Sequence, residues 1–364
     1  MNNGLSKRLY IAGTGMITAI GYSSTTTSLF LAAAQSGYQR THHRSKNGEP
    51  ITMALVPSEV FDTVDFEVEE CNPYHAQFDH RLKMAVIAAR ETLQHHPINQ
   101  PIPLMLAMPE PDFGPAVPHG LLTNNLAELC APAVSPQLTR SFHCGRAAGI
   151  EALDFAFRHL AENQFILIGG SDSPIHMDQI KKLDETDRLL TIKSPDSFAP
   201  GEGASFLLLT SNPELALAKN NCIIALHPPG LAEESGHMYS DEPYRGDGLD
   251  QAFKKALINQ PEQSIDAIYS SMNGEHFWAK EYGVAYLRSK AKFKDPVRIE
   301  HPADCIGDLG CATATTLISL AAENLWTQKS QQKHLVYSSS DTAKRGAIIV
   351  EKIPVSNKTT SEGY

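Results

Sequence analysis

Short, fully apolar runs alternate along this chain with segments whose apolar residues recur at helical spacing. An apolar run of four to six residues between turn residues predicts a buried strand, as at 165–168, which ends in Gly169-Gly170. Segment 80–95 shows the other pattern, with leucine, methionine and isoleucine spaced to cover one face of a helix. The first half has predicted strands at 9–12, 103–108, 165–168 and 204–209, and predicted helices at 24–34, 80–95, 120–129 and 148–160. Regular alternation of this kind predicts an α/β protein with helices packed on sheets.

The second half of the chain repeats this alternation. It has predicted strands at 222–226, 267–270, 335–338 and 347–350, and predicted helices at 249–257, 279–289 and 312–326. A polar stretch precedes residue 222, so we expect two halves, 1–210 and 222–354, that are related by an internal pseudo-duplication. The Ser/Thr-rich tail, 355–364, is expected to be disordered. Segment 40–50 is predicted to be an exposed loop.

Composition narrows the possible partners. The 364 residues include 31 Lys+Arg and 41 Asp+Glu, a net charge of −10, and no basic block that could neutralise nucleic-acid phosphates. No apolar run approaches the ~20 residues of a membrane span, and the N-terminus lacks a signal-peptide pattern. Six scattered cysteines without a CxxC pair favour reduced thiols in the cytoplasm over disulfides or zinc. No cofactor or metal motif is present, so we expect neither.

One segment carries candidate chemistry, the run Ser141-Phe-His-Cys-Gly-Arg-Ala-Ala-Gly149 that leads into a predicted helix. A cysteine at a strand-to-helix turn has its thiolate favoured by the helix N-terminus, and neighbouring backbone N–H groups can form an oxyanion hole. Cys144 is therefore a candidate nucleophile that should react quickly with alkylating reagents. The alternative is a buried structural cysteine at a tightly packed helix start.

Motifs in consistent order resemble those of β-ketoacyl-acyl carrier protein synthases, members of the thiolase-like superfamily. They are IAGTGMITAIG at 11–21, the interval from Cys144 to Gly169-Gly170, and SPDSFAPGEGASFLLL at 194–209. The resemblance implies a five-layered αβαβα fold and a homodimer formed through the edge strand near Cys144. It also implies an acyl thioester substrate, on acyl carrier protein or coenzyme A, with Cys144 as acyl acceptor.

The chain departs from this family at the other catalytic positions. Ser271 stands where the first catalytic histidine would fall, and Asp308 stands where the second would fall. Segment 338–342, Ser-Ser-Ser-Asp-Thr, replaces the family's glycine-rich loop. Condensation uses the two imidazoles as hydrogen-bond donors to the forming enolate, whereas an ionised Asp308 only accepts and would also raise the pKa of a nearby thiol. We therefore expect no decarboxylative condensation.

Two functions remain open at this point. The first is a divergent ketosynthase-like acyltransferase that acts on acyl thioesters through Cys144, with Ser271 and Asp308 completing the site. The second is an inactive homologue that serves as a scaffold or adaptor. Retention of Cys144 favours the first, and loss of both histidines favours the second. The variants Met272-Asn-Gly-Glu275 and Gly307-Asp-Leu-Gly310 also resemble thiolase-like proteins encoded beside bacterial secretion effectors.

Several polar residues near the lost histidines have no assigned role. A relay of Cys144, His276 and Asp308 would allow acyl transfer or hydrolysis, but His276 is more simply a packed or surface residue at a helix start. His143 points away from its neighbour in an extended segment and is expected in the core or at a dimer interface. Arg146 replaces a small residue of the family, and it either lowers the pKa of Cys144 or forms an ion pair across an interface. Asn273 and Glu275 are further candidates.

Overall fold

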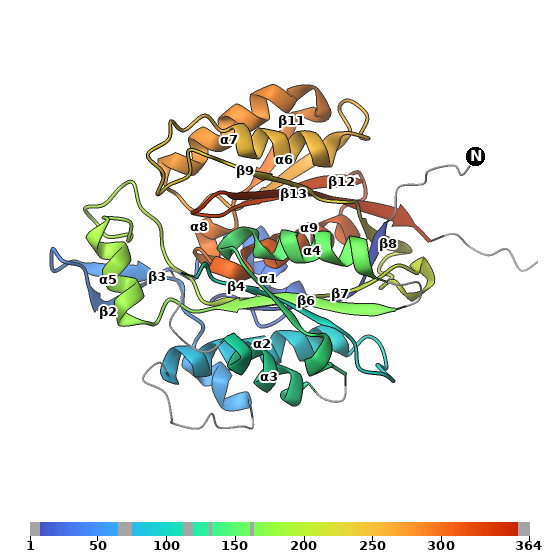
Figure 1. The fold of residues 1–364 in the computed structure, drawn as a ribbon, viewed down its shortest axis with the longest axis horizontal. Helices are drawn as coiled ribbons and strands as arrows, with labels where there is room; N and C mark the ends of the chain where they lie inside the picture. Colours follow the sequence, from blue (N-terminus) through green and yellow to red (C-terminus); the bar gives the residue numbers. More distant parts are fainter. Residues whose placement is uncertain (1–7, 65–74, 112–118, 131–132, 161–163, 356–364) are drawn as a thin grey trace, which may run out of the picture.

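A computed structural model describes residues 8–64, 75–111, 119–130, 133–160 and 164–355 (Figure 1). The predicted tail, 355–364, lies outside the described residues except for Val355. In the part of the chain that is described, no helix is both long and apolar enough to cross a membrane.

The strands of the N-terminal half form one side of a large mixed sheet, in the order β1-β7-β6-β4-β5. They are β1 (Leu9–Thr18), β4 (Leu104–Met108), β5 (Arg140–His143), β6 (Phe165–Asp172) and β7 (Gly203–Thr210). Every residue of β4 and β7 is buried, which confirms that their continuous apolar runs mark strands covered on both faces. β5 is the edge strand, and Cys144 follows it directly.

The strands of the C-terminal half continue the same sheet, because β8 pairs with both β1 and β13. These strands are β8 (Cys222–Leu226), β9 (Gly230–Glu233), β10 (Ile265–Ser270), β11 (Phe293–Glu300), β12 (Lys333–Ser339) and β13 (Lys344–Pro354). β10 pairs in parallel with β11 and β12, as β4 does with β5 and β6 in the other half.

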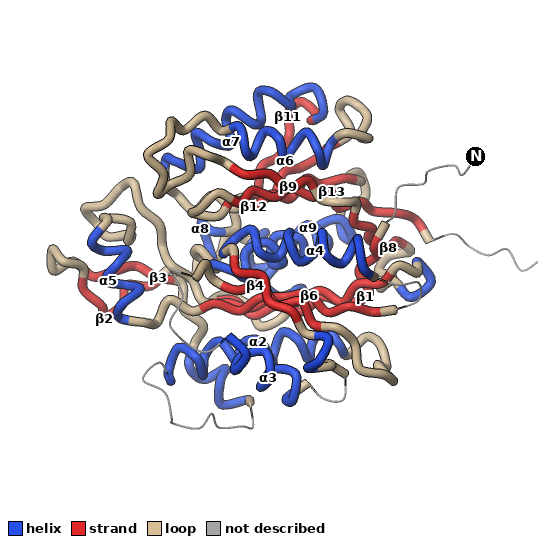
Figure 2. Tube along the Cα trace, viewed as in Figure 1, coloured by secondary structure: helices blue, strands red, loops and turns tan. Residues whose placement is uncertain are grey.

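Helices form three layers, and the N-terminal and C-terminal halves of the sheet lie between them (Figures 1 and 2). α4 (Ala148–His159) and α9 (Thr313–Thr327) form the middle layer, where α9 is buried around almost its whole circumference. α2 (His75–Leu93) and α3 (His119–Leu129) form one outer layer, and α6 (Asp247–Leu257) and α7 (His276–Ser289) form the other. Three hydrophobic clusters fill the spaces between neighbouring layers. The predicted order αβαβα is confirmed.

A smaller unit lies at one side of these layers, and it corrects one prediction. Segment 40–50 is not a loop throughout, because β2 (Gln39–Arg44) pairs with β3 (Pro50–Met53). The hairpin is fixed by apolar residues of its second strand, since Ile51 and Met53 pack against Leu183 of α5 (Met177–Glu185) and its neighbours. The polar first strand is mostly exposed, which is why its sequence is typical of a loop.

The two central helices begin in the same way. A single 3-10 turn precedes each, at Gly145–Ala147 before α4 and at Gly310–Ala312 before α9, and the two turns lie in contact. The glycines that open them, Gly145 and Gly310, both have positive φ, at 57° and 51°. A backbone in this region favours glycine because a side chain would clash. These turns bring the candidate site residues of both halves together. Two further short α-helices are α1 (Ser24–Ala32) and α8 (Ala303–Ile306).

Candidate functional site

Cys144 lies at the predicted strand-to-helix turn, between β5 and α4. Its side chain is 5% exposed and packs against Ala107, Ala148 and Cys311. The thiol donates a hydrogen bond to Oε2 of Glu151, 3.2 Å away on the first turns of α4. The other oxygen of Glu151 pairs with Lys344 at 3.1 Å. The thiol therefore donates to a carboxylate that is already paired with a lysine, and this contact favours the protonated thiol.

These surroundings correct the expectation of a reactive thiolate. Burial raises the pKa of Cys144, and the Glu151 carboxylate raises it further, so the protonated thiol is favoured. Lys344 opposes the shift without reversing it. The predicted effect of a nearby carboxylate is present, but it comes from Glu151 and not from Asp308.

The buried guanidinium of Arg146 lies at the centre of the site and bonds to three partners. Nη1 contacts Asp308 at 2.6 Å, Nη2 contacts Asp341 at 2.5 Å, and Nε donates to the carbonyl of Ser339 at 2.9 Å. The guanidinium also stacks 4.2 Å from the ring centre of Trp278. Of the two predicted roles for Arg146, the structure supports an ion pair, but one within this chain.

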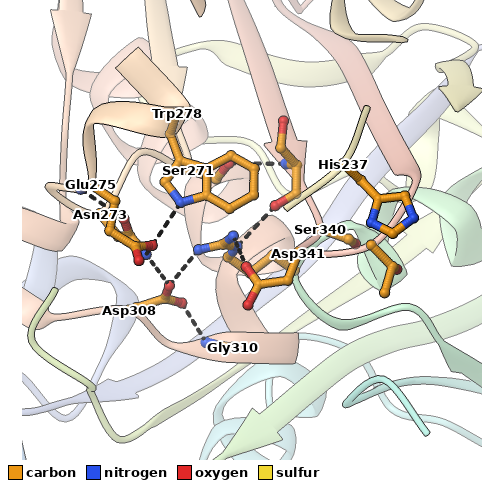
Figure 3. A network of polar contacts seen from close by, with 12 residues as sticks. His237, Ser271, Asn273, Glu275, Trp278, Asp308, Gly310, Ser340 and Asp341 are labelled. Carbon is orange, nitrogen blue, oxygen red and sulfur yellow. Dashed lines mark hydrogen bonds and ion pairs between the residues drawn. The ribbon is translucent and has the colours of Figure 1, made fainter. Parts of the chain in front are cut away.

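A second buried arginine extends the network. Figure 3 shows Glu275, Asp308 and Asp341, which take part in it, close to one another. Arg188 binds Glu275 through two bonds, of 2.7 and 2.9 Å, and reaches Asp341 at 2.6 Å. Glu275 also accepts the indole N–H of Trp278 at 2.9 Å. Although burial opposes it, the two guanidinium groups lower the pKa of Asp341 to about 2. We call Arg146, Arg188, Glu275, Asp308 and Asp341 the ion network.

Asp308 and Ser271 line the same small cavity. Their side chains are engaged in hydrogen bonds with the backbone and, for Asp308, with the ion network. Asp308 accepts from Arg146, from Asn273 at 2.8 Å and from the backbone N–H of Gly310 at 3.0 Å. Ser271 accepts a hydrogen bond from the backbone N–H of Ser339 at 3.0 Å. Both residues line a cavity of about 20 Å³ that has room for roughly one water molecule.

Ser338–Ser340, the serine run in the segment that replaces the glycine-rich loop, hydrogen-bonds to the turn at residues 144–147. Ser338 donates to the carbonyl of Arg146 at 2.7 Å. The hydroxyl of Ser340 donates to the carbonyl of Cys144 and accepts from the N–H of Ala147 at 3.2 Å. A loop that must open for a substrate would lose all three bonds, so this arrangement favours a closed site.

A larger cavity, of about 100 Å³, lies on the other side of the ion network. Arg146, Asp308 and Asp341 form part of its wall, together with Glu110 and Asp172. Cys144 is not among the residues that line it. Gly145 and Arg146, in the turn that follows Cys144, do line it.

The remaining histidine candidates do not join the site. His276 begins α7 with its side chain 81% exposed, and Nδ1 lies 3.3 Å from Asp196. The relay of Cys144, His276 and Asp308 is therefore not assembled. His143 is half-buried on β5, with Nε2 at 2.9 Å from the hydroxyl of Ser141.

Three residues of the site carried no predicted role: Glu151, Arg188 and Asp341. Glu151 follows Cys144 by seven residues, two helical turns, so helical periodicity placed it on the same face. Asp341 lies in the segment already noted as replacing the glycine-rich loop. Arg188 lies in a loop after α5, and nothing in its local sequence marks it.

Comparisons with known proteins agree on the fold. No protein-family model and no curated protein matches this chain. Among solved structures, the ishigamide ketosynthase/chain length factor is similar with a TM-score of 0.75 and 17% identity, over 95% of this chain and 99% of that one. A type II polyketide acyl-carrier protein in complex with its ketosynthase also gives 0.75, with 15% identity over 95% and 99%. The module 6 bacillaene ketosynthase of Bacillus subtilis gives 0.72, with 12% identity over 95% and 72%. At these identities the comparisons establish a thiolase-like fold of the ketosynthase type.

Proposed function

We propose that this chain is a ketosynthase-like protein without condensing activity that acts by binding a partner, as a scaffold or adaptor. The observation that carries the proposal is the ion network. At the positions where the resemblance places two imidazole donors, Asp308 holds Arg146, and Ser271 accepts from the backbone. An ionised Asp308 has no donor for an enolate oxygen, and Ser271 has one neutral hydroxyl in place of an imidazole.

The state of Cys144 favours this function over the acyltransferase. A nucleophilic cysteine is favoured by a lowered pKa, whereas burial and the Glu151 carboxylate raise the pKa of Cys144. The serine run also closes the turn that an acyl chain would need to reach.

The partner that we propose is an acyl carrier protein or a second thiolase-like chain. Support comes from two of the similar structures, one of an acyl-carrier protein in complex with its ketosynthase and one of a ketosynthase/chain length factor. A secretion effector is the alternative that the sequence variants suggest. Co-purification from the source cell followed by mass spectrometry would distinguish these partners.

To test for decarboxylation and acyl transfer, the protein is given a malonyl thioester and a medium-chain acyl thioester in separate assays. Cys144→Ala is the matched control, and a competent ketosynthase is the positive control. We expect carbon dioxide release at the uncatalysed rate and no covalent acyl-protein, with no difference between the unchanged protein and Cys144→Ala. Decarboxylation that disappears in Cys144→Ala would refute the proposal. Acylation of Cys144 without decarboxylation would establish the divergent acyltransferase instead.

A double substitution, Ser271→His with Asp308→His, tests whether the lost imidazoles alone explain inactivity. We expect it to remain inactive, because removing Asp308 leaves the Arg146 guanidinium buried without one of its two carboxylates and the serine run remains. Recovery of decarboxylation would show that the site is still built for condensation.

A further inference from the structure

The smaller cavity, which Ser271 and Asp308 line, has further polar side chains in its wall. Thr313 and Thr316 contribute hydroxyl groups from the first turn of α9. Apolar side chains, among them that of Ile306, close another part of the wall. The volume of about 20 Å³ exceeds the roughly 10–15 Å³ that one water molecule needs, and it leaves little room for anything larger.

The two threonine hydroxyls are buried without a hydrogen-bond partner. Thr316 is 1% exposed and Thr313 is 9% exposed, and neither Oγ1 atom bonds to any group in the described part of the chain. A threonine on a helix can donate to the carbonyl one turn earlier. Thr315 does so, because its hydroxyl bonds to the carbonyl of Ala312 at 3.2 Å and to that of Ser205 at 3.0 Å. Since a buried hydroxyl without a partner is costly, the two free hydroxyls indicate a bound polar ligand.

Ser271 adds a third hydroxyl to this set. Its oxygen accepts the backbone N–H of Ser339 at 3.0 Å, while its own O–H donates to no group in the described chain. A hydroxyl carries one donor and two acceptor positions, so each of the three can donate to a ligand or accept from it. The neighbouring Ser270 is already engaged, because its hydroxyl bonds to that of Tyr337 at 2.7 Å. A ligand with two donors and two acceptors matches the set, and water is such a ligand of the right size.

The charges around the cavity favour a neutral ligand. Among the described residues that line it, Asp308 is the only charged one, and Arg146 already pairs with this carboxylate at 2.6 Å. Its Oδ1 accepts a hydrogen bond from Gly310, and its Oδ2 accepts another from Asn273. A cation would therefore find no uncompensated charge to offset the loss of its hydration. An apolar ligand would leave the hydroxyls without partners.

We propose that this cavity binds one ordered water molecule through the hydroxyls of Ser271, Thr313 and Thr316. The water connects the segment after β10, which holds Ser271, to the start of α9. It stabilises the same part of the site as the ion network, by hydrogen bonds between neutral groups instead of ion pairs. The proposal goes beyond the absence of condensation and does not depend on it, because no thioester takes part.

A high-resolution crystal structure of the full chain tests the site directly. We expect one compact peak of electron density in the cavity, at about 2.5–3.0 Å from the three hydroxyl oxygens, which is hydrogen-bond spacing. A peak at about 2.0–2.4 Å from the same oxygens would have the spacing of a metal ion and would overturn the proposal. A cavity without density would overturn it as well.

Thr316→Val tests the site in solution, because valine has nearly the shape of threonine but lacks the hydroxyl. If the hydroxyl had no partner, valine would remove a buried unsatisfied group and stabilise the protein. With a bound water, valine removes one of the partners of that water. We therefore expect the equilibrium constant for unfolding in urea titrations to rise by roughly two- to tenfold. A lower unfolding constant for Thr316→Val than for the unchanged protein would overturn the proposal.

Coupling between the two threonines provides a matched control. Thr313→Val and Thr316→Val act on the same water, so the double substitution should raise the unfolding constant by less than the product of the two single effects. Thr92 is fully buried on α2, donates to the carbonyl of Ala88 at 2.8 Å and does not line the cavity. Thr92→Val combined with Thr316→Val should therefore give the full product. If Thr313→Val and Thr316→Val also give the full product, no shared water connects them and the proposal is wrong.

Discussion

Replacing Arg146 with methionine tests whether the ion network is a structural unit of this protein. Methionine keeps much of the side-chain volume but removes the charge and every donor. Asp308 and Asp341, which are 2.6 and 2.5 Å from the guanidinium, would then lie buried with reduced compensation, and the carbonyl of Ser339 would lose its donor. The stacking on Trp278 would also be lost.

The expected cost is large because one partner of a buried pair is removed and the other is left. Breaking a buried ion pair in this way costs about 3–5 kcal/mol in the free energy of unfolding. Arg188 still compensates Asp341, which places the expectation near the lower end of that range. An exposed pair offers the matched control: Arg158, with its side chain 63% exposed, pairs with Asp154, and Arg158→Met should cost less than about 1 kcal/mol.

Urea unfolding followed by tryptophan fluorescence is a suitable assay, because Trp278 contacts Arg146 and is one of only two tryptophans in the chain. A double substitution, Arg146→Met with Asp308→Asn, should cost less than the sum of the two single ones, because the second removes a charge that the first leaves without a guanidinium partner. If Arg146→Met unfolds at the same urea concentration as Arg158→Met, or if the two single effects add, the network is not the buried unit described here.

Three further predictions concern other parts of the molecule. Iodoacetamide should label the half-buried Cys222 and Cys305 before the buried Cys144 in folded protein, and peptide mass spectrometry showing Cys144 modified first would contradict its raised pKa. Burial raises the pKa of Glu91 to about 7, so this carboxyl group holds its proton more tightly in the folded protein than in the unfolded chain. The contribution of Glu91 to the free energy of unfolding therefore falls as pH rises from about 4.5 to 7. Glu91→Gln should therefore gain stability relative to the unchanged protein, by about 3 kcal/mol, between pH 4.5 and pH 8 in urea titrations, and a constant difference would refute this. Light scattering should report a homodimer formed through edge strand β5, and a mass of 39.8 kDa, that of one chain, would exclude it.

The arrangement of helices and strands was predictable from the sequence because it depends on local hydrophobic periodicity. Apolar runs such as 204–209 have no polar face, so they fit a strand covered by helices on both sides, which is where β7 lies. The hairpin of β2 and β3 was not predictable in the same way. Its first strand is polar, and its place depends on contacts between Ile51 and α5, more than a hundred residues later in the chain.

The candidate site was predictable only where a motif marks it. Cys144, Ser271 and Asp308 were found by comparing the chain with a family pattern, and the structure places Ser271 and Asp308 around one small cavity. Their chemical state was not predictable, because it is set by residues distant in sequence. Asp308 is paired with Arg146, 162 positions earlier, and Asp341 with Arg188, 153 positions earlier.

These distant partners change what the substitutions mean. Considered alone, Asp308 at the position of a histidine removes a hydrogen-bond donor. Arg146 at the position of a small residue adds volume and charge for no evident reason. In the fold each compensates the other, because a buried carboxylate and a buried guanidinium are both unfavourable unless they are paired. Asp341 and Arg188 complete the pairing. Since each of these charges is stabilised by its partners, we propose that the network takes the place of a condensing site as a unit, so that a single reversion toward the ketosynthase pattern would leave a charge without one of its partners.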